Sequence, residues 1–194
     1  MEKEHYFSRL NTHLQKIVSL SNVDLEYIKT HFSVKYIAKK EYLIRPFQRS
    51  IHESYIASGL FQTSIIDDSG KEFVLYFPHE DWWTGDFKSF SMGQGSMLEI
   101  QALEDSVLLQ ITRDDLERLY HKIPAFERFF RIMNGRAAIA LQDRLVQHFS
   151  TNADKKILDF YEKYPRLQGR LSNKRVAAYL GVTPEYFSKT LKKI

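Results

Sequence analysis

The spacing of apolar residues changes twice along the chain, from helical to strand-like and back to helical. Near the N-terminus, four apolar residues recur at helical intervals: Phe7, Leu10, Leu14 and Ile17. A second short helix is predicted after Ser21, with Asp24 placed to complete a capping box. Between residues 34 and 111 the apolar runs are short, rich in β-branched and aromatic residues, and broken by turns. The turn sequence Asp-Asp-Ser-Gly at residues 67–70 predicts a hairpin over residues 65–74.

A long helical pattern begins at Pro124 and continues to about Phe149, a length of roughly 39 Å. Its apolar seam steps by four and three residues through Phe126, Phe130, Met133, Ala137 and Ala140, and a neighbouring stripe continues through Leu141, Leu145 and His148. The small residues beside Gly135 would let a second helix approach closely, so we predict that two chains form a homodimer through this helix. The alternative is that the stripe packs on the chain's own sheet.

The C-terminal region predicts three further helices. The first spans residues 152–164, with Thr151 and Asp154 at its start. The last two lie between Ser172 and Ile194 and are separated by Gly181, which suits the left-handed residue that ends a helix. We expect Ser172 to cap the first of this pair, which has an apolar stripe of Val176, Ala177 and Leu180. Thr183 is expected to cap the second, with Pro184 in its first turn and Phe187, Leu191 and Ile194 on its apolar face.

The opposite face of the last helix is polar. It presents Glu185, Tyr186, Ser188, Lys189 and Lys192. Residues 170–194 have a formal charge of +5, whereas the whole chain has +4, so nearly all of the excess positive charge lies in these two helices. A helix that is held on one side by a partner helix and is basic on the other is typical of DNA reading in the major groove. The alternative is a solvated amphipathic pair of helices.

Composition limits the class of protein. The chain has no cysteine, which excludes disulfides, iron–sulfur clusters and thiolate zinc sites. The N-terminus is too charged for a signal peptide, and no apolar run approaches the roughly 20 residues needed to cross a bilayer. We therefore expect a cytoplasmic protein with no membrane partner.

Catalytic and metal-binding motifs are missing from the sequence. The seven histidines include no pair at helical ligand spacing, and there is no Gly-x-Ser-x-Gly motif and no phosphate-binding loop. The adjacent carboxylates at residues 67–68, 80–81 and 114–115 suit turns and helix starts better than acid–base catalysis. We expect neither an enzyme nor a resident metal or cofactor.

In its order of elements, the chain resembles bacterial Crp/Fnr-type transcription regulators over almost its full length. The resemblance is carried by three segments: YIASGLFQTSIIDDSGKEFVLYFPHEDWWTGD, IQALEDSVLLQIT and LSNKRVAAYLGVTPEYFSKTLKKI. It implies an α+β fold in three parts. Residues 1–118 would form N-terminal helices on an antiparallel β-roll or jelly roll of the cyclic-nucleotide-binding type, residues 119–150 a dimerisation helix, and residues 151–194 a small all-α helix-turn-helix domain.

The resemblance also implies roles for individual residues. Pro184, Glu185 and Lys189 would read bases, and Thr183 would contact a phosphate. Glu185 can accept from a cytosine amino group, Lys189 can donate to guanine, and Pro184 offers only apolar contact. Family members usually continue into a β-hairpin wing, for which no residues follow Ile194. We therefore expect Lys174, Arg175, Lys192 and Lys193 to make the nonspecific phosphate contacts.

The expected effector pocket departs from the family pattern. Where nucleotide-binding members have a Gly-Glu pair and an Arg-Ser/Thr pair, this chain has Gly85, Asp86, Ser96 and Met97. Because the phosphate-binding arginine is missing, we expect no binding of cyclic AMP. Aromatic residues including Phe73 and Trp83 would line a cavity for an unidentified small-molecule effector or simply form the core of the roll.

These observations predict a homodimeric, sequence-specific regulator that binds double-stranded DNA. The alternative is a sensor or protein-interaction module whose vestigial helix-turn-helix does not bind DNA.

Overall fold

The computed structural model describes residues 2–193 and the side chains of all of these except Glu2 and His148. The chain divides into two compact units. The first unit contains Met1–Ser64 and Tyr76–Asn134, and the second contains Ile65–Leu75 and Gly135–Ile194. The predicted boundary between residues 118 and 119 falls inside the helix Arg113–Lys122. The predicted boundary between residues 150 and 151 falls at the end of the helix Pro124–Ser150.

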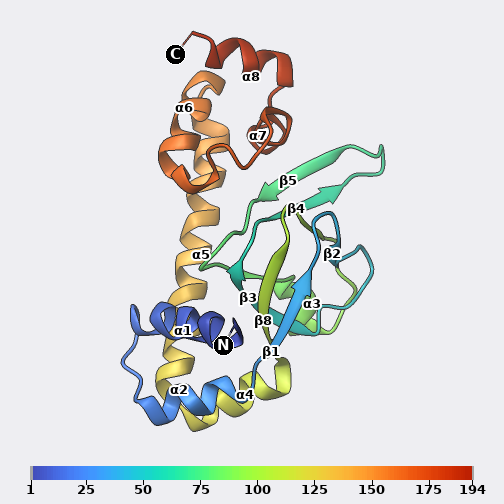
Figure 1. The fold of residues 1–194 in the computed structure, drawn as a ribbon. Helices are drawn as coiled ribbons and strands as arrows, with labels where there is room; N and C mark the ends of the chain where they lie inside the picture. The colour runs from blue at the N-terminus through green and yellow to red at the C-terminus, as the bar shows by residue number, and fades with distance from the viewer. Residues whose placement is uncertain (1, 194) are drawn as a thin grey trace. The chain divides into compact units, whose positions relative to one another are not determined.

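The β-roll consists of two antiparallel four-stranded sheets, which confirms the predicted fold class (Figure 1). The strand orders are β1-β8-β3-β6 and β2-β7-β4-β5. The hairpin predicted over residues 65–74 joins β4 to β5, and the carboxylate of Asp67 accepts from the backbone N–H groups of Ser69 and Lys71 in its turn. The strands are β1 (Ser33–Ile37), β2 (Tyr42–Ile44), β3 (His52–Ser58), β4 (Phe61–Ile66), β5 (Glu72–Tyr76), β6 (Trp83–Thr84), β7 (Glu99–Ala102) and β8 (Ser106–Thr112).

Helices of the first unit pack on one sheet of the roll. Their bounds are α1 (Glu2–Gln15), α2 (Asn22–Lys29), α3 (Phe87–Met92) and α4 (Arg113–Lys122), followed by the start of α5 (Pro124–Ser150). The capping box predicted at Ser21 and Asp24 is present, and Thr112 caps α4 through Asp115. The sequence analysis did not predict α3, which begins after Asp86 and ends at Gly93 in the left-handed conformation.

Two apolar clusters lie on opposite faces of the β1-β8-β3-β6 sheet, because neighbouring residues of a strand point to opposite sides. Inside the roll, Ile56 of β3 and Leu108 of β8 pack with Ile37, Ile44, Phe61, Ile100 and Ala102. On the other face, Tyr55 and Leu109 pack against α1, α4 and the start of α5, where Leu10, Phe126, Phe129 and Phe130 are buried. The side chain of Tyr55 donates to Asp81, which is also paired with Arg9.

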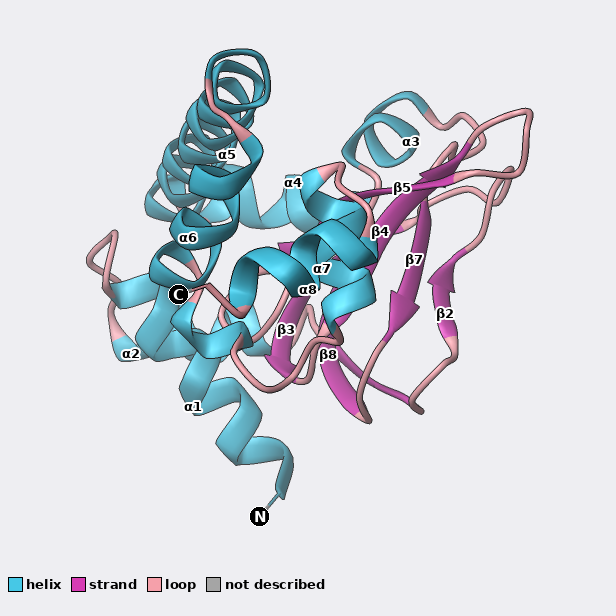
Figure 2. Ribbon diagram, turned by 90° about the horizontal axis from the view of Figure 1, so that it is seen from above, coloured by secondary structure: helices cyan, strands magenta, loops and turns pink. Residues whose placement is uncertain are grey.

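The second unit contains the rest of α5, the tip of the β4–β5 hairpin and a group of short helices (Figure 2). These helices are α6 (Ala153–Lys163), the 3-10 turn η1 (Pro165–Leu167), α7 (Asn173–Leu180) and α8 (Pro184–Leu191). Asn152 caps α6 by accepting from the N–H of Lys155, in place of the predicted Thr151. Over residues 2–193, no helix has both the length and the apolar character required to cross a bilayer.

Candidate nucleic-acid interface

The two helices α7 and α8 form the helix-turn-helix that the sequence predicts. Gly181 ends α7 with a φ of 71°, and the N–H of Val182 bonds to the carbonyl of Ala177 at 3.0 Å. Thr183 caps α8, because its hydroxyl accepts from the N–H of Tyr186 at 3.1 Å, and Pro184 occupies the first turn. Ser172 stands at the N-cap position of α7 but makes no side-chain capping bond, unlike the prediction.

One face of α8 is fixed by apolar packing within the second unit. Phe187 is fully buried, as are Val176 and Ala177 on α7. The buried side chains of Ile157 and Phe160 from α6, together with Leu167 and Leu171, complete this small core. Leu191 is half-buried, whereas Ile194 lies outside the described residues. The outer face of α8 therefore has a fixed orientation before any ligand arrives.

That outer face carries most of the residues predicted to read DNA. Pro184, Glu185 and Lys189 are exposed, as is Thr183 at the cap. Ser188 is half-buried. Of the residues predicted to contact phosphates, Lys174, Lys192 and Lys193 are exposed and Arg175 is half-buried. The structure thus places three base-reading candidates on one exposed helical turn and a half, with cationic side chains on both helices to meet phosphates.

Tyr186 differs from the other residues of this face. Its hydroxyl donates to the carboxylate of Asp154 on α6 at 2.8 Å, and the hydroxyl of Thr190 donates to the same oxygen at 3.1 Å. These two hydrogen bonds hold the pKa of Asp154 below its usual range. Asp154 therefore links α6 to α8 by two hydrogen bonds, and Tyr186 serves as an anchor of the helix as well as a member of its exposed face.

A second polar link involves Arg144 of α5. Its guanidinium donates to the carbonyl of Val74 in the hairpin tip at 2.9 Å and to the carbonyl of Tyr179 in α7 at 3.3 Å. It also lies 4.2 Å from the centre of the Tyr179 ring, a cation–π distance. One side chain thus connects three segments of the second unit. Sequence reasoning missed both Asp154 and Arg144 in these roles, because their partners are distant in sequence.

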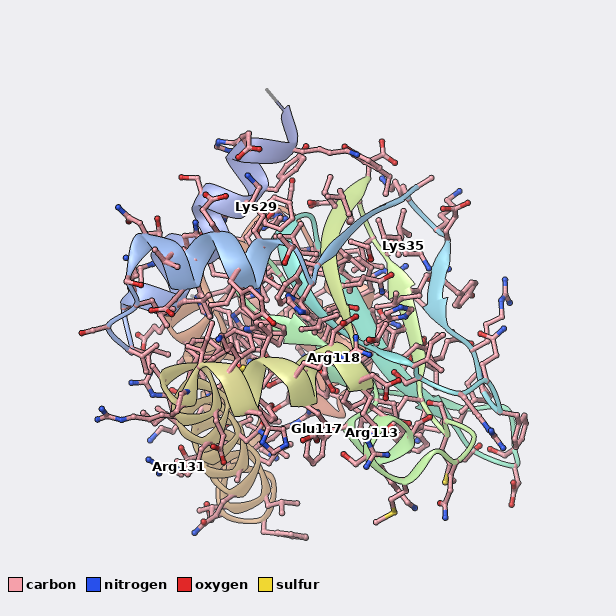
Figure 3. The ribbon with its side chains drawn as sticks, turned by 90° about the horizontal axis from the view of Figure 1, so that it is seen from below. Lys29, Lys35, Arg113, Glu117, Arg118 and Arg131 are labelled. Carbon is pink, nitrogen blue, oxygen red and sulfur yellow. The ribbon has the colours of Figure 1, made fainter. Side chains whose placement is uncertain are left out.

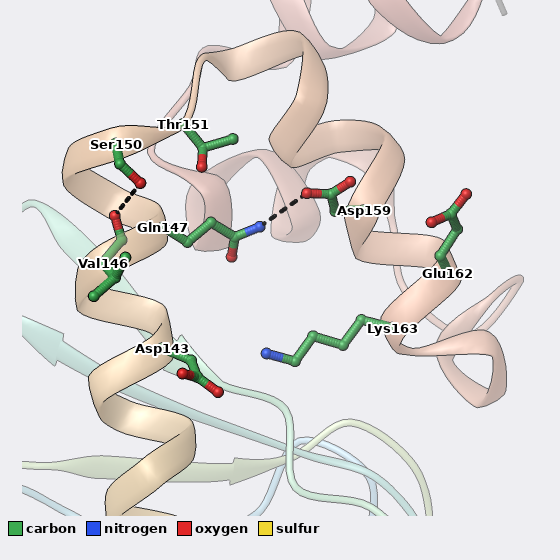
Figure 4. Close-up of a pocket in the computed structure, with 8 residues that line it drawn as sticks. All are labelled: Asp143, Val146, Gln147, Ser150, Thr151, Asp159, Glu162 and Lys163. Carbon is green, nitrogen blue, oxygen red and sulfur yellow. Dashed lines mark hydrogen bonds between the residues drawn. The ribbon is translucent and has the colours of Figure 1, made fainter.

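An open pocket of about 570 Å³ lies between α5 and α6 (Figure 4). Three of its lining side chains are the carboxylates Asp143, Asp159 and Glu162, and one is the cation Lys163. The amide of Gln147 donates to Asp159 at 3.4 Å. Because acidic groups predominate, this pocket repels phosphate and does not extend the basic surface of α7 and α8.

In the roll, the structure brings together two of the six predicted effector-pocket residues. Asp86 and Ser96 are both buried, and the Ser96 hydroxyl donates to the Asp86 carboxylate at 2.6 Å. Asp86 also caps α3 by accepting from the N–H of Ser89 at 3.0 Å. Gly85 is half-buried beside them, whereas the side chain of Met97 is 73% exposed. The hydroxyl of Ser96 and the carboxyl group of Asp86 therefore satisfy each other's hydrogen-bonding capacity.

A second buried carboxyl group lies on β3, outside the predicted pocket. Glu53 on β3 is buried, and its Oε1 has no hydrogen-bond partner among the described residues. Burial, with a contribution from the Asp86 charge, raises the pKa of Glu53 to about 8. Glu53 alternates with Ser54 along β3 and therefore lies on the same face of the sheet as Tyr55, the helical side, where it keeps its proton near neutral pH.

The two predicted pocket aromatics lie in separate surroundings. Trp83 packs on the helical side of the sheet, with its ring 4.7 Å from that of Phe130 and 5.7 Å from that of Tyr55. Phe73 belongs to the hairpin tip of the second unit, where it is partly exposed beneath Lys71. Trp83 is therefore part of the first unit's core.

The predicted dimer seam is divided between two environments. Phe126 and Phe130 are buried in the chain's own core, and Met133 packs against it. Ala137 and Ala140 are exposed. From Gly135 onward, α5 exposes a wide apolar face formed by Ile139, Leu141, Leu145, Val146 and Phe149. The side chain of His148 lies outside the described residues. The side chains available to a partner helix are therefore rotated from the predicted seam.

No cluster of three or more metal-ligating side chains occurs among the residues that the structure describes.

Comparison with known proteins agrees with this architecture. Residues 34–122 match the family model of the cyclic nucleotide-binding domain. Among solved structures, FixK2 from Bradyrhizobium japonicum is similar with a TM-score of 0.73 and 15% identity, over 84% of this chain and 83% of FixK2. No curated protein matches the chain by sequence.

Two further structures have the same fold. CLP, a c-di-GMP-responsive global regulator from Xanthomonas campestris, aligns with a TM-score of 0.71 and 18% identity, over 89% of this chain and 91% of CLP. A protein from Eubacterium rectale assigned to the Crp/Fnr family of transcriptional regulators aligns with a TM-score of 0.68 and 16% identity, over 90% of this chain and 83% of that protein. The predicted resemblance is confirmed: the chain has the Crp/Fnr-type architecture with a cyclic-nucleotide-binding-type roll.

Proposed function

We propose that this chain, which has the fold of Crp/Fnr-type transcription regulators, is a homodimeric regulator that binds double-stranded DNA sequence-specifically through α8. The observation that carries the proposal is the exposed polar face of a helix whose opposite face is buried at Phe187. A rigid helix of this kind can enter the major groove, where each base pair presents a distinct set of donors and acceptors. The proposal includes no catalytic activity and places the protein in the cytoplasm.

Base reading is assigned to the exposed start of α8. Glu185 would accept from a cytosine amino group, and Lys189, one turn further along, would donate to guanine O6 or N7. Pro184 would make apolar contacts, and Thr183 would approach a phosphate. Lys174 and Arg175 on α7 and Lys192 and Lys193 at the end of α8 would neutralise phosphates without reading sequence.

Dimerisation is assigned to the exposed face of α5 from Gly135 onward. Gly135, Ala138, Gln142, Leu145 and Phe149 recur at alternating steps of three and four residues, the spacing of a coiled-coil seam. Among the described residues, no atom outside its own helix lies within 4 Å of a Cβ position on Gly135, so Gly135 is available for close approach by a second helix. A two-fold dimer would present its two α8 helices to half-sites about 34 to 36 Å apart.

The roll is proposed not to respond to cyclic AMP. The reason is the missing arginine: Ser96 and Met97 stand at the aligned positions, and the Ser96 hydroxyl is bonded to the buried carboxyl group of Asp86. If the roll binds an effector, that molecule must favour one arrangement of the dimer helices over another to act as a switch. Its chemistry would be neutral or cationic, in keeping with the buried carboxyl group of Asp86.

The test is a mobility-shift titration on the DNA upstream of the protein's own gene. The wild-type protein should form a discrete complex, and Lys189→Ala should lose it. The double change Lys192→Ala and Lys193→Ala should instead weaken binding to all sequences and reduce the salt slope by up to about two counterions per protomer. If Lys189→Ala leaves the complex intact, α8 does not read DNA and the protein is better described as a sensor or protein-interaction module.

A further inference from the structure

Five large apolar side chains are exposed on two short segments of the first unit, residues 45–51 and 87–97. Phe47 is 89% exposed and Met97 is 73% exposed, whereas Ile51, Phe87 and Met92 are 62–65% exposed. Single exposed apolar residues are common, but several on adjoining segments mark an interaction surface. We refer to these five side chains as the docking surface.

Hydrogen bonds join the two segments into one structure. The N–H of Phe47 donates to the carbonyl of Ser96 at 2.7 Å, and the N–H of Ser96 donates to the carbonyl of Gln48 at 2.8 Å. The N–H of Ser50 donates to the hydroxyl of Ser89 on α3 at 2.8 Å. At the other end of α3, Arg113 of α4, which is labelled in Figure 3, lies close enough to donate to the carbonyl of Ser91 at 3.0 Å. The backbone that carries the docking surface is therefore fixed before any partner binds.

Phe47 is held in an unfavourable backbone conformation. Its φ is 69°, in the left-handed region that bulky residues rarely adopt and glycine adopts freely. The opposing residue must be small, because a Cβ on Gly95 would lie 2.9 Å from the carbonyl oxygen of Phe47. The strain is not offset by burial, since the phenyl ring projects into solvent. Strained residues of this kind concentrate at functional sites, which suggests that the ring is retained for binding.

The charges on the two segments themselves have one sign. Arg45, Arg49 and Lys88 are exposed on the same two segments. Neither segment contains an Asp or a Glu, and the neighbouring acid Asp86 is buried. A partner that pairs with these cations must be anionic, a charge that a protein supplies as carboxylates, and one that covers the five apolar side chains must also be apolar.

We propose that the docking surface binds an acidic, apolar segment of a partner protein. Phe47 and Met97 are the apolar anchors, and Arg45, Arg49 and Lys88 pair with acidic residues at the edge. A surface with a fixed backbone loses little backbone freedom on binding, which favours a peptide with matching side chains over a fluid lipid layer. The two methionines can adapt their shape to different apolar partners. The proposal does not depend on DNA binding, which is assigned to the second unit.

The experiment uses short random peptides displayed on phage as the probe. Peptides are selected on the full-length protein after those that also bind Phe47→Gly have been removed. Phe47→Gly deletes the ring and relieves the backbone strain, so it tests the surface without risking the fold. The selected peptides should combine Leu, Phe or Ile with Asp or Glu.

Affinities of one selected peptide are then measured by fluorescence anisotropy. Phe47→Gly should weaken binding roughly tenfold or more, as expected for loss of a central aromatic anchor. Arg49→Gln should weaken binding less and reduce its dependence on salt. Val23→Ser, which removes an apolar side chain that is 79% exposed on α2, should have no effect.

Three results would overturn the proposal: no enrichment of any peptide, enrichment of peptides without acidic residues, or equal binding by the wild-type protein and Phe47→Gly. Sedimentation with phosphatidylglycerol vesicles that depends on Phe47, without peptide binding, would also overturn it in favour of a lipid surface. Lys189→Ala should bind the selected peptide as the wild-type protein does. Failure of the docking proposal is therefore distinguishable from failure of DNA binding.

Discussion

Replacing Glu53 by Gln should remove much of the pH dependence of the first unit's stability. The carboxyl group is buried on β3, and its Oε1 has no partner among the described residues. Burial disfavours the charged form and raises the pKa to about 8 in the folded protein, compared with 4.5 for an ordinary Glu. Between these two values the folded chain keeps a proton that the unfolded chain has released.

The sign and size of the effect follow from proton linkage. Because the unfolded state binds fewer protons than the folded state in this range, the free energy of unfolding falls as pH rises from about 4.5 to about 8. The slope approaches about 1.4 kcal/mol per pH unit and flattens near each pKa, so the loss between pH 5 and pH 8 is about 3.5 kcal/mol. Above the folded pKa, both states are ionised and the loss becomes constant.

The assay is urea unfolding at several pH values, followed by the fluorescence of Trp82 and Trp83, which both belong to the first unit. The free energy of unfolding of Glu53→Gln should exceed that of the wild-type protein at pH 8 by more than at pH 5. The control is Glu117→Gln, an exposed side chain on α4, which should keep the wild-type slope. The reasoning is refuted if Glu53→Gln and the wild-type protein show the same change in unfolding free energy with pH.

Three further results are expected. Gly59→Ala should lower the free energy of unfolding by about 3 kcal/mol or more, because φ is 112° and the new Cβ would overlap the Ser106 side chain. The control is Gly70→Ala, which is also at positive φ but has nothing within 4 Å among the described residues. It should lower the free energy of unfolding by about 1 kcal/mol in the same urea titration. Leu145→Asp should convert the dimer to monomer in analytical ultracentrifugation, since it places a charge in the proposed seam, and an unchanged sedimentation coefficient would exclude this face. Asp154→Ala and Tyr186→Phe should each weaken DNA binding. The double variant should lose less affinity than the sum of the two single losses, because both changes break the same hydrogen bond. Strict additivity would show that Tyr186 acts on DNA independently.

Local sequence signals predicted many individual elements of the fold. The capping box at Ser21, the hairpin over residues 65–74, the left-handed Gly181 and the cap at Thr183 are all present, because each depends on residues within a few positions of one another. The short helix α3 was missed. Its cap is Asp86, but its six residues are too few to show a helical period.

Long-range contacts were beyond the sequence signal. The periodicity of α5 showed two apolar stripes, but only the packed structure shows that Phe126 and Phe130 are buried by the chain's own α1 and α4 while the later apolar residues are exposed. Asp154 was interpreted as a helix-start residue because its partners, Tyr186 and Thr190, are more than 30 positions away. The exposed state of Phe47 had no signal, since an aromatic residue beside a strand predicts burial.

The central claim is that α8 reads base sequence in duplex DNA, and selection of bound duplexes from a random-sequence pool tests it most directly. The account predicts enrichment of a near-palindromic site whose half-sites lie about one helical turn apart, with the preferred bases changing in Glu185→Ala and Lys189→Ala. The claim is contradicted if the pool remains random after repeated selection at low salt with wild-type protein that is folded and dimeric.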